Sequence, residues 1–427
     1  MSAPAPKPWD TAYEFKIILL LSLAFGLVGL DRFILPVLFP SMMGELGLNE
    51  LQLGTLAGIL AVAWGVAAFA MGYMSDRLGR RKVLVPSVVA FSLLSALSGV
   101  ATGFLSLLII RAVMGIAEGP VASTGVAVAV EASHPSRRGL NNGIFQCMIS
   151  LFGLALGPLI ATKLLVGFNL FGMSIGPYTW HEVFMIVGVP GLILAIFMWF
   201  VIREPETTAA GAHGHHAPRP TFADLFKHRN VPLAMLTLMC AMAGIFVLAA
   251  MMPVYLQGYL KLSTEQMGGV FSAIGFGGFI GQFALPAVSD FIGRKPATLI
   301  SYAVAAVFLY FFINTGAENL TTLFWLLFGA ALFNFAALAI LAGPVAAEAA
   351  PIGMVASVAG AVIGAGEVFG GGIAPVIAGW IANTWGIQNT LWFALGGQVL
   401  GTIIALFLTE TAPRKVGASM SGVRVGA

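Results

Sequence analysis

The sequence predicts an all-α integral membrane protein with twelve transmembrane helices in two pseudo-symmetric halves of six. Three observations predict this fold class. Of the 427 residues, 59% are hydrophobic and 9% are charged, whereas soluble domains carry about 25% charged residues. Twelve apolar stretches are each long enough to cross a bilayer, for which about 20 residues suffice. A short motif after the second stretch returns after the eighth, which divides the chain into repeated halves.

Each apolar stretch is interpreted as one membrane helix, with short polar connections between them. The first stretch is longer than the apolar region of a signal peptide and no small-residue cleavage site ends it, so we expect it to remain as a membrane helix. The predicted spans are 15–40, 53–74, 83–102, 104–130, 140–166, 181–202, 232–258, 265–289, 297–315, 320–346, 353–383 and 387–409. Several exceed the minimum length, which predicts tilting or extension beyond the bilayer.

The longest polar connection, residues 203–230, is expected to be a flexible cytoplasmic linker. It separates an N-terminal half, 1–202, from a C-terminal half, 231–427. The linker contains three prolines and a short histidine tract at 213–216. Metal binding is the alternative interpretation of this tract, but no cluster of further ligands supports it, so we predict no metal site.

Basic residues gather in the connections on one side of the predicted bundle. The connections on the other side hold only Lys163 and Lys261. Because cytoplasmic loops carry the excess of Lys and Arg, both termini are expected to be cytoplasmic, in a multi-pass plasma (inner) membrane protein. Topology explains these basic residues, so no nucleic-acid partner is expected. The composition suits a monomer surrounded by lipid.

The repeated motif follows the second and the eighth spans. Asp76-Arg-Leu-Gly-Arg-Arg and Asp290-Phe-Ile-Gly-Arg-Lys begin 214 residues apart, at 76 and 290. Glycine permits a tight turn there, and the aspartate can receive an arginine or a helix N-terminus. We expect ion pairs on the inner face that latch the halves and release on opening. The predicted latch residues are Asp76, Arg77, Gly79, Arg80, Asp290 and Arg294. Satisfying the positive-inside rule is the alternative role for these arginines.

Asp31 and Arg32 lie near the centre of the first span. A charged side chain there costs about 2.5–3.5 kcal/mol, and such residues face a bundle interior or a watery cavity. Arg32 is the candidate substrate anchor, because its planar fork matches a carboxylate. Pairing with an acidic side chain for packing is the alternative. Asp31 points about 100° away and is expected to face a neighbouring helix as a proton site or in an ion-pair network.

Glu118 in the fourth span is the candidate proton carrier. Burial disfavours its charged form and a nearby arginine favours it, so a site that alternately dries and wets can bind and release a proton. Arg111 is seven residues earlier and lies on the same face, about 10 Å along the helix axis. It is expected to tune Glu118, with packing at the helix end as the alternative.

Three further residues are candidates for the substrate cavity. Gln146 lies in the fifth span, Tyr255 near the outer end of the seventh and Glu367 in the eleventh. A polar side chain inside a span can instead bond to a neighbouring helix. For Tyr255 the alternative is a place in the aromatic belt at the membrane interface.

These motifs identify a resemblance to the major facilitator superfamily over essentially the whole chain. Residues 72–82, Gly-Tyr-Met-Ser-Asp-Arg-Leu-Gly-Arg-Arg-Lys, resemble its signature between helices 2 and 3, and residues 111–120 resemble its fourth-helix motif. The Asp31–Arg32 pair together with Glu118 is similar to the anion:cation symporter branch, which implies proton-coupled transport of organic acids. Glu367 departs from that branch, which commonly has a neutral residue such as Asn there. Residues 153–158, Gly-x-x-x-Gly-Pro, resemble an antiporter motif, although a small-residue helix contact explains them equally well.

The expected function is proton-coupled import of a small organic anion, a carboxylate or sugar acid, by alternating access. Its partners are that anion and protons, and its energy source is the proton gradient, without a bound cofactor. The alternative is a proton-driven antiporter that exports a drug, sugar or metabolite. An enzyme is not expected, because the chain has no nucleophile motif, no Gly-rich phosphate loop and no cluster of metal ligands.

Overall fold

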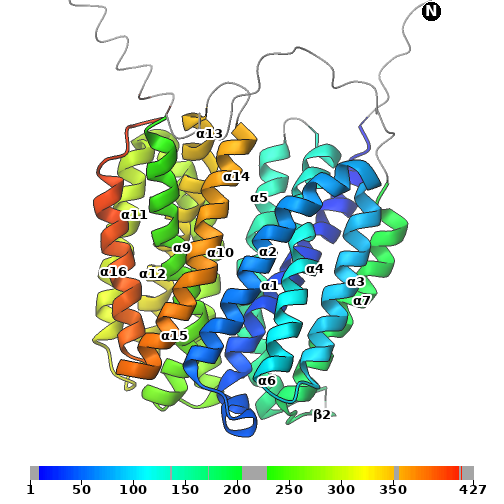
Figure 1. Ribbon diagram of the computed structural model, residues 1–427, viewed down its shortest axis with the longest axis vertical. Helices are drawn as coiled ribbons and strands as arrows, with labels where there is room; N and C mark the ends of the chain where they lie inside the picture. Colours follow the sequence, from blue (N-terminus) through cyan, green and yellow to red (C-terminus); the bar gives the residue numbers. More distant parts are fainter. Residues whose placement is uncertain are drawn as a thin grey trace, which may run out of the picture.

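The computed structural model describes residues 9–134, 137–171, 173–203, 228–350, 355–412 and 415. Two helical bundles stand side by side, with the N-terminal half on the right and the C-terminal half on the left of Figure 1. Within the described residues, eleven helices are long and apolar enough to cross a membrane, and the shorter apolar helix Asn389–Ala405 completes twelve spans. The predicted fold class is therefore confirmed. Most of the predicted linker, 204–227, lies outside the described residues.

The N-terminal half holds the first six spans. The first four are single helices, and the fifth is built from two α-helices joined by a π-helical stretch. The elements are α1 (Thr11–Leu46), α2 (Glu50–Leu78), α3 (Arg80–Ser98), α4 (Phe104–Ala132), α5 (Arg138–Met148), η2 (Ile149–Leu156), α6 (Gly157–Val166) and α7 (Trp180–Val201). The 36-residue α1 is longer than a bilayer requires, as expected for a tilted or extended span.

The C-terminal half repeats this order, with π-helical stretches in its first, fourth and fifth spans. Its elements are α9 (Asn230–Val254), η3 (Tyr255–Tyr259), α10 (Thr264–Ile292), α11 (Arg294–Ile313), α12 (Leu320–Ile340), η4 (Leu341–Val345), α13 (Ala346–Ala349), α14 (Val355–Gly366), η5 (Glu367–Ile373), α15 (Ala374–Trp385) and α16 (Asn389–Ala405). Because π-helical stretches interrupt regular backbone bonding, they are frequent at functional sites.

The helix ends show the internal repeat at the level of single hydrogen bonds. Asn49 and Gln52 form a reciprocal capping box at the start of α2, and Ser263 and Gln266 form one at the start of α10. Each box satisfies backbone N–H groups that the first helical turn leaves without partners. The second span of each half therefore begins with the same local structure.

The same two spans also end alike. Gly79 terminates α2 with φ 101°, and Gly293 terminates α10 with φ 109°. Residues with a side chain rarely adopt this backbone region. The predicted tight turn at Gly79 is thus confirmed and recurs at the equivalent position of the other half.

A small β-hairpin connects α6 to α7, where the sequence analysis expects only a polar connection. Strands β1 (Phe168–Leu170) and β2 (Met173–Ile175) pair antiparallel. The pairing lets a short segment at the end of the bundle satisfy its backbone N–H and C=O groups. The hairpin is too short to carry a hydrophobic periodicity that the sequence could reveal.

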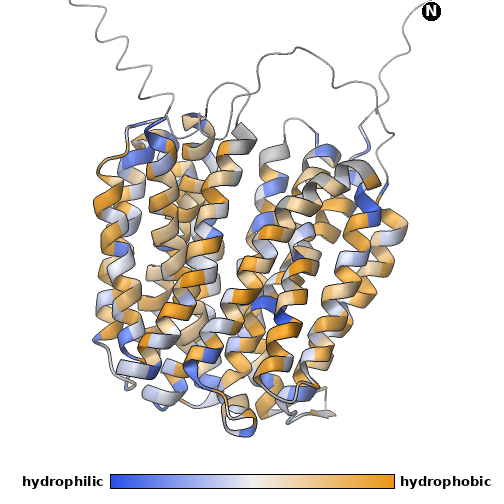
Figure 2. Cartoon of the chain, viewed as in Figure 1, coloured by the Kyte–Doolittle hydropathy of each residue, from blue (hydrophilic) through white to orange (hydrophobic). Residues whose placement is uncertain are grey.

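The surface of the bundle matches a membrane environment. In Figure 2 hydrophobic residues dominate the outer faces of the helices, and hydrophilic residues are frequent at the two ends of the bundle. Many large apolar side chains lie exposed on these faces, among them Phe200, Phe291 and Trp325. Lipid tails solvate such side chains, so the exposed apolar surface agrees with twelve spans.

The two halves lean together at the end of the bundle opposite to the start of α1 and the end of α16 (Figure 1). There α2 packs on α15, and α10 packs on η2 and α6. Lys163 at the end of α6 forms an ion pair with Glu265 in the first turn of α10. Deeper in the bundle, Gln282 donates a hydrogen bond to the Ser150 hydroxyl at 2.7 Å. These contacts close the space between the halves on that side.

Candidate functional site

The centre of the molecule holds an ion pair between the two halves. Arg32 lies in the middle of α1, where every residue from Phe25 to Phe39 is buried. Its Nη2 donates to Oε2 of Glu367 at 3.0 Å. Glu367 is the first residue of the π-helical stretch η5, in the opposite half. Two residues that the sequence analysis placed in one cavity therefore do meet, and each side chain is buried.

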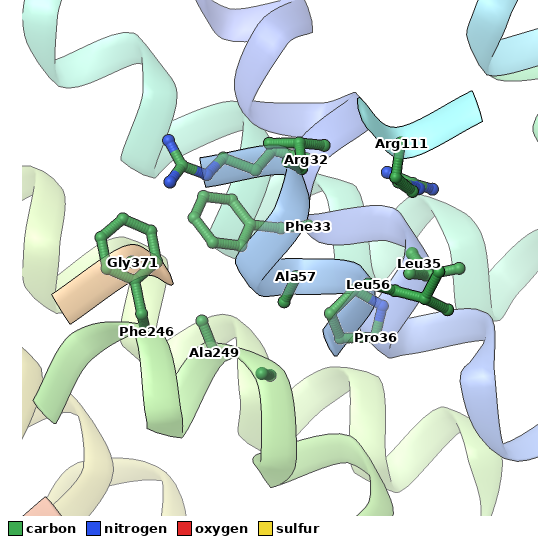
Figure 3. Close-up of a pocket in the computed structure, with 12 residues that line it drawn as sticks. Arg32, Phe33, Leu35, Pro36, Leu56, Ala57, Arg111, Phe246, Ala249 and Gly371 are labelled. Carbon is green, nitrogen blue, oxygen red and sulfur yellow. The ribbon is translucent and has the colours of Figure 1, made fainter. Parts of the chain in front are cut away.

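Aromatic rings surround the Arg32 guanidinium. Its central carbon lies 4.4 Å from the ring centre of Phe246 on α9, 5.5 Å from that of Trp64 on α2 and 5.9 Å from that of Phe33. A guanidinium within about 6 Å of a ring face is attracted by its quadrupole. In Figure 3 the Arg32 side chain extends above the Phe33 ring, with Phe246 and Gly371 beyond it. The rings hold the cation in place without neutralising it.

A small cavity adjoins this ion pair. Its volume is about 20 Å³, which is room for about one water molecule. Apart from two arginines its walls are apolar. The lining residues are Arg32, Phe33, Leu35, Pro36, Leu56, Ala57, Leu60, Arg111, Phe246, Ala249, Ala250 and Gly371. The walls come from α1, α2, α4, α9 and η5, so both halves of the molecule contribute to it.

Asp31 points away from Arg32, as predicted. It is 2% exposed, and its Oδ1 accepts a hydrogen bond of 2.6 Å from Ser95 on α3. Arg111 on α4 donates from Nη1 to the backbone carbonyl of Asp31 at 2.9 Å. Asp31 and Arg111 are thus joined through the backbone of α1, at the position that orients Arg32.

Glu118 is fully buried on α4. Within the described part of the chain, neither of its carboxyl oxygens has a hydrogen-bond partner. Nε and Nη2 of Arg111, two turns earlier on the same helix, also have no partner there. An ionised carboxylate without partners in an apolar interior is very costly, whereas a neutral carboxylic acid is tolerated far better.

The other two predicted cavity residues lie apart from this ion pair. Gln146 is half-buried on α5, and neither it nor Tyr255 lines the cavity beside Arg32. Tyr255 opens η3, is 2% exposed, stacks on Tyr259 and lies at a tilt against Phe312. A role for these two residues in substrate binding stays a prediction.

The motif of the N-terminal half forms a cluster at the end of the bundle where α1 begins and α16 ends. Arg80, at the start of α3, donates to Glu131 near the end of α4 at 2.7 Å and to the Ser75 hydroxyl on α2 at 2.7 Å. These contacts join three helices of one half. The side chains of Asp76 and Arg77 lie outside the described residues.

The motif of the C-terminal half forms the equivalent cluster. Arg294 at the start of α11 binds Asp290 at 2.6 Å and Glu348 at 3.0 Å, and it donates to the Ser289 hydroxyl at 2.5 Å. The bonds of Arg294 to these three partners join residues of one half, and so do the bonds of Arg80 to Glu131 and Ser75. In this conformation the two halves meet at the opposite end of the bundle. A latch between the halves therefore stays a prediction, for a conformation in which the halves meet at the end that holds these clusters.

Several site residues carry no signal in the sequence. Phe246 and Gly371 are ordinary residues of apolar spans until Arg32 and Glu367 are placed beside them, and the sequence indicates for Trp64 only packing or a place in the cavity wall. Ser95 could be suspected only once Asp31 was known to face α3. Among the described residues no group of three or more His, Cys, Asp and Glu side chains gathers in a way that could hold a metal ion.

A twelve-span bundle with charged residues buried between two repeated halves defines a membrane transporter rather than an enzyme. The chain belongs to the major facilitator superfamily, whose family model matches residues 21–362 and 234–424. The resemblance on which the sequence analysis relied is therefore confirmed at the level of the superfamily.

Known relatives transport organic acids. The chain is 27% identical to a probable 4-methylmuconolactone transporter of Cupriavidus pinatubonensis, over 91% of this chain and 88% of that protein. It is 28% identical to a hexuronate transporter of Bacillus subtilis, over 66% of each chain. The solved structure of a bacterial homologue of the human lysosomal transporter Spinster, inward-facing and unoccupied, matches with a TM-score of 0.72. That match has 17% identity and covers 94% of this chain and 97% of the other, which supports the fold.

Proposed function

We propose that this protein imports a small organic anion together with protons by alternating access. The observation that carries the proposal is Arg32, a charged anchor buried between the halves and held by rings from α1, α2 and α9. The proposed setting is the plasma (inner) membrane, with both termini in the cytoplasm. The proton gradient supplies the energy, so no bound cofactor is needed.

Arg32 is the proposed substrate anchor. An arginine stays charged in proteins and offers a planar fork of donors to a carboxylate. Glu367 already places one carboxylate oxygen 3.0 Å from Arg32 Nη2, so the geometry for binding such a group exists here. The organic acids named for the relatives from Cupriavidus pinatubonensis and Bacillus subtilis agree with this role.

Glu118 is the proposed proton carrier. Its buried carboxyl group, without protein partners in the described residues, suits the protonated form. Exposure to water on opening would favour release of the proton. Arg111 and Asp31 are proposed to assist, since Arg111 reaches the carbonyl of Asp31 and lies two turns from Glu118.

Electrostatics favours coupling to protons. Moving one negative charge into a cell with a negative interior costs about 2.3 kcal/mol per 100 mV. One proton carried with a monoanion cancels this cost, and a second makes the membrane potential assist uptake. Asp31 and Glu118 can supply one or two such proton sites.

The test is uptake into proteoliposomes with and without an imposed inward proton gradient. Labelled glucuronate, benzoate and a neutral sugar form the panel, and protein-free liposomes are the control. A carboxylate that accumulates only with the gradient supports the proposal. Failure of both acids to enter under either condition overturns it.

Proton-driven export is the second candidate, because Glu367 adds a third carboxylate inside the predicted spans, after Asp31 and Glu118. Gly153 belongs to the stretch 153–158 that resembles an antiporter motif, but helix packing explains it. A Cβ at Gly153 would lie 2.5 Å from the carbonyl oxygen of Gly29 on α1. The same proteoliposomes distinguish the two candidates. Accumulation of a solute against an opposing proton movement would establish antiport.

A further inference from the structure

We propose that the Glu367 carboxylate occupies the seat of the substrate carboxylate on Arg32, and that the walls of this seat select a carboxylate with a flat, apolar body. This inference rests on the proposed organic-anion transport and deepens it. The seat is defined by Arg32, Glu367, Gly371, Trp64 and Phe246.

Glu367 marks the position of the seat. Its Oε2 accepts from Arg32 Nη2 at 3.0 Å in a buried setting, across the two halves. While Glu367 remains, its charge offsets that of Arg32 and would repel a second carboxylate brought to the same nitrogen. Substrate and Glu367 must therefore exchange places. The adjoining cavity of about 20 Å³ has room for about one water molecule, so it offers the substrate carboxylate no separate place.

Gly371 makes the space for this carboxylate. It lies four residues after Glu367 in η5. A Cβ at this position would lie 3.0 Å from Glu367 Oε2 and 3.3 Å from Arg32 Nη2. Such contacts are tighter than ordinary packing permits, so any side chain at this position would crowd whatever binds that nitrogen.

Trp64 offers a second hydrogen-bond donor near the seat. Its ring centre lies 5.5 Å from the Arg32 guanidinium carbon. The indole Nε1 is buried and has no acceptor among the described residues. A buried indole N–H usually finds a partner, and a substrate carboxylate exchanged onto Arg32 would bring an acceptor to this part of the site.

The side chains that line the cavity determine what kind of molecule can carry the substrate carboxylate. Beside the two arginines, the cavity lining is aliphatic and aromatic, with the rings of Phe33 and Phe246 next to each other beside the guanidinium. Their rings are separated by 6.2 Å and inclined by 23°. A polyhydroxylated acid would leave several hydroxyl groups without partners there, which is costly, whereas a flat apolar ring packs on such walls.

The experiment measures equilibrium binding of labelled benzoate to the purified full-length protein at one fixed pH. Glu367→Gln keeps the size of the side chain and removes its competing charge, so benzoate should bind about tenfold more tightly, the effect of a charged hydrogen bond. Adding Gly371→Ala to Glu367→Gln should abolish this gain. The matched control, Glu367→Gln with Gly364→Ala, should keep it, because a Cβ at Gly364 has no atom within 4 Å.

Trp64→Phe keeps a ring and removes the donor, and should weaken benzoate binding severalfold. Glucuronate tests the walls, and wild-type protein should bind it at least about tenfold more weakly than benzoate. Weaker benzoate binding by folded, monodisperse Glu367→Gln would overturn the exchange of seats. Tighter binding of glucuronate than of benzoate would overturn the apolar seat and leave organic-anion transport standing. If neither acid bound to any variant, the proposed function would fail as well.

Discussion

The two halves of the molecule share a helical plan but differ in their chemistry inside the membrane. The N-terminal half buries Asp31, Arg32, Arg111 and Glu118 in its spans. In the middle of the C-terminal spans, the described residues include one buried charged side chain, Glu367. The repeat therefore preserves the architecture, while the buried charges in the middle of the described spans are concentrated in one half.

Neutral amides lie between the corresponding helices of the C-terminal half. Asn334 on α12 and Gln398 on α16 meet around Gly244 on α9, where an added Cβ would contact both amide nitrogens. These helices are the fourth, sixth and first of their half, as α4, α7 and α1 are of theirs. In the N-terminal half Arg111 lies between the equivalent helices, against the Asp31 carbonyl and 5.6 Å from the ring centre of Phe184. We infer that the N-terminal half carries proton coupling and that the C-terminal half supplies the partner of Arg32.

The largest effect is expected from removing Arg32, whose buried charge pairs with Glu367 across the two halves. Arg32→Ala should lower carboxylate transport by about a hundredfold, because truncating one member of a buried, charged pair costs about 2–5 kcal/mol. Arg32→Lys should rescue only part of it, since an ammonium lacks the planar fork. Initial uptake rates measure both, with the exposed Arg203→Ala as the control. Near-normal carboxylate uptake by Arg32→Ala would remove the anchor from the account.

The next effect separates coupling from binding within the N-terminal half. Glu118→Gln should abolish proton-driven accumulation while substrate exchange across the membrane continues. A gradient of one pH unit supports about tenfold accumulation through one coupled proton, equivalent to 1.36 kcal/mol, and the variant should show none. Counterflow and gradient-driven uptake in the same vesicles measure the two processes. A Glu118→Gln protein that still concentrates its substrate would show that the proton binds elsewhere.

A smaller effect is expected at the repeated clusters around Arg80 and Arg294, where the two halves can be compared directly. Arg294→Ala should destabilise the protein by about 2 kcal/mol, because its buried guanidinium donates to several charged partners. Arg80→Ala should cost about 1 kcal/mol or less, since Glu131 is 44% exposed and solvent screens the pair. Thermal unfolding in detergent gives the order. Equal losses would mean that burial does not distinguish the two clusters.

The smallest effect concerns the ion pair between Lys163 and Glu265, which joins the two halves at the end of the bundle opposite to the start of α1. Lys163 and Glu265 are each about half exposed, so Lys163→Gln should change the free energy between conformations by no more than about 1 kcal/mol. Transport rates should stay within about fivefold of wild type. A tenfold change would place this ion pair among the main determinants of opening.

The sequence predicts the spans, the repeat and the charged residues, because these depend on composition and spacing. Twelve apolar runs announce the fold, and Arg32 and Glu118 stand out as charges inside them. The direction of Asp31 could be anticipated as well, since neighbouring helical residues point about 100° apart.

The pairing of Arg32 with Glu367 required the structure. The two residues are 335 positions apart, and no periodicity indicates which faces of α1 and η5 meet. Phe246 and Gly371 were invisible for a related reason, because an apolar residue in a membrane span signals a function only through its neighbours. The β-hairpin before α7 escaped notice because it is short.

The most direct test of the inferred division of labour compares Glu118→Gln with Glu367→Gln in matched proteoliposomes. Uptake of labelled benzoate is measured with and without an inward proton gradient. We expect Glu118→Gln to lose gradient-driven accumulation, and Glu367→Gln to keep it with a lower KM. The reverse result, with accumulation lost in Glu367→Gln and kept in Glu118→Gln, would assign proton coupling to the C-terminal half and contradict this account.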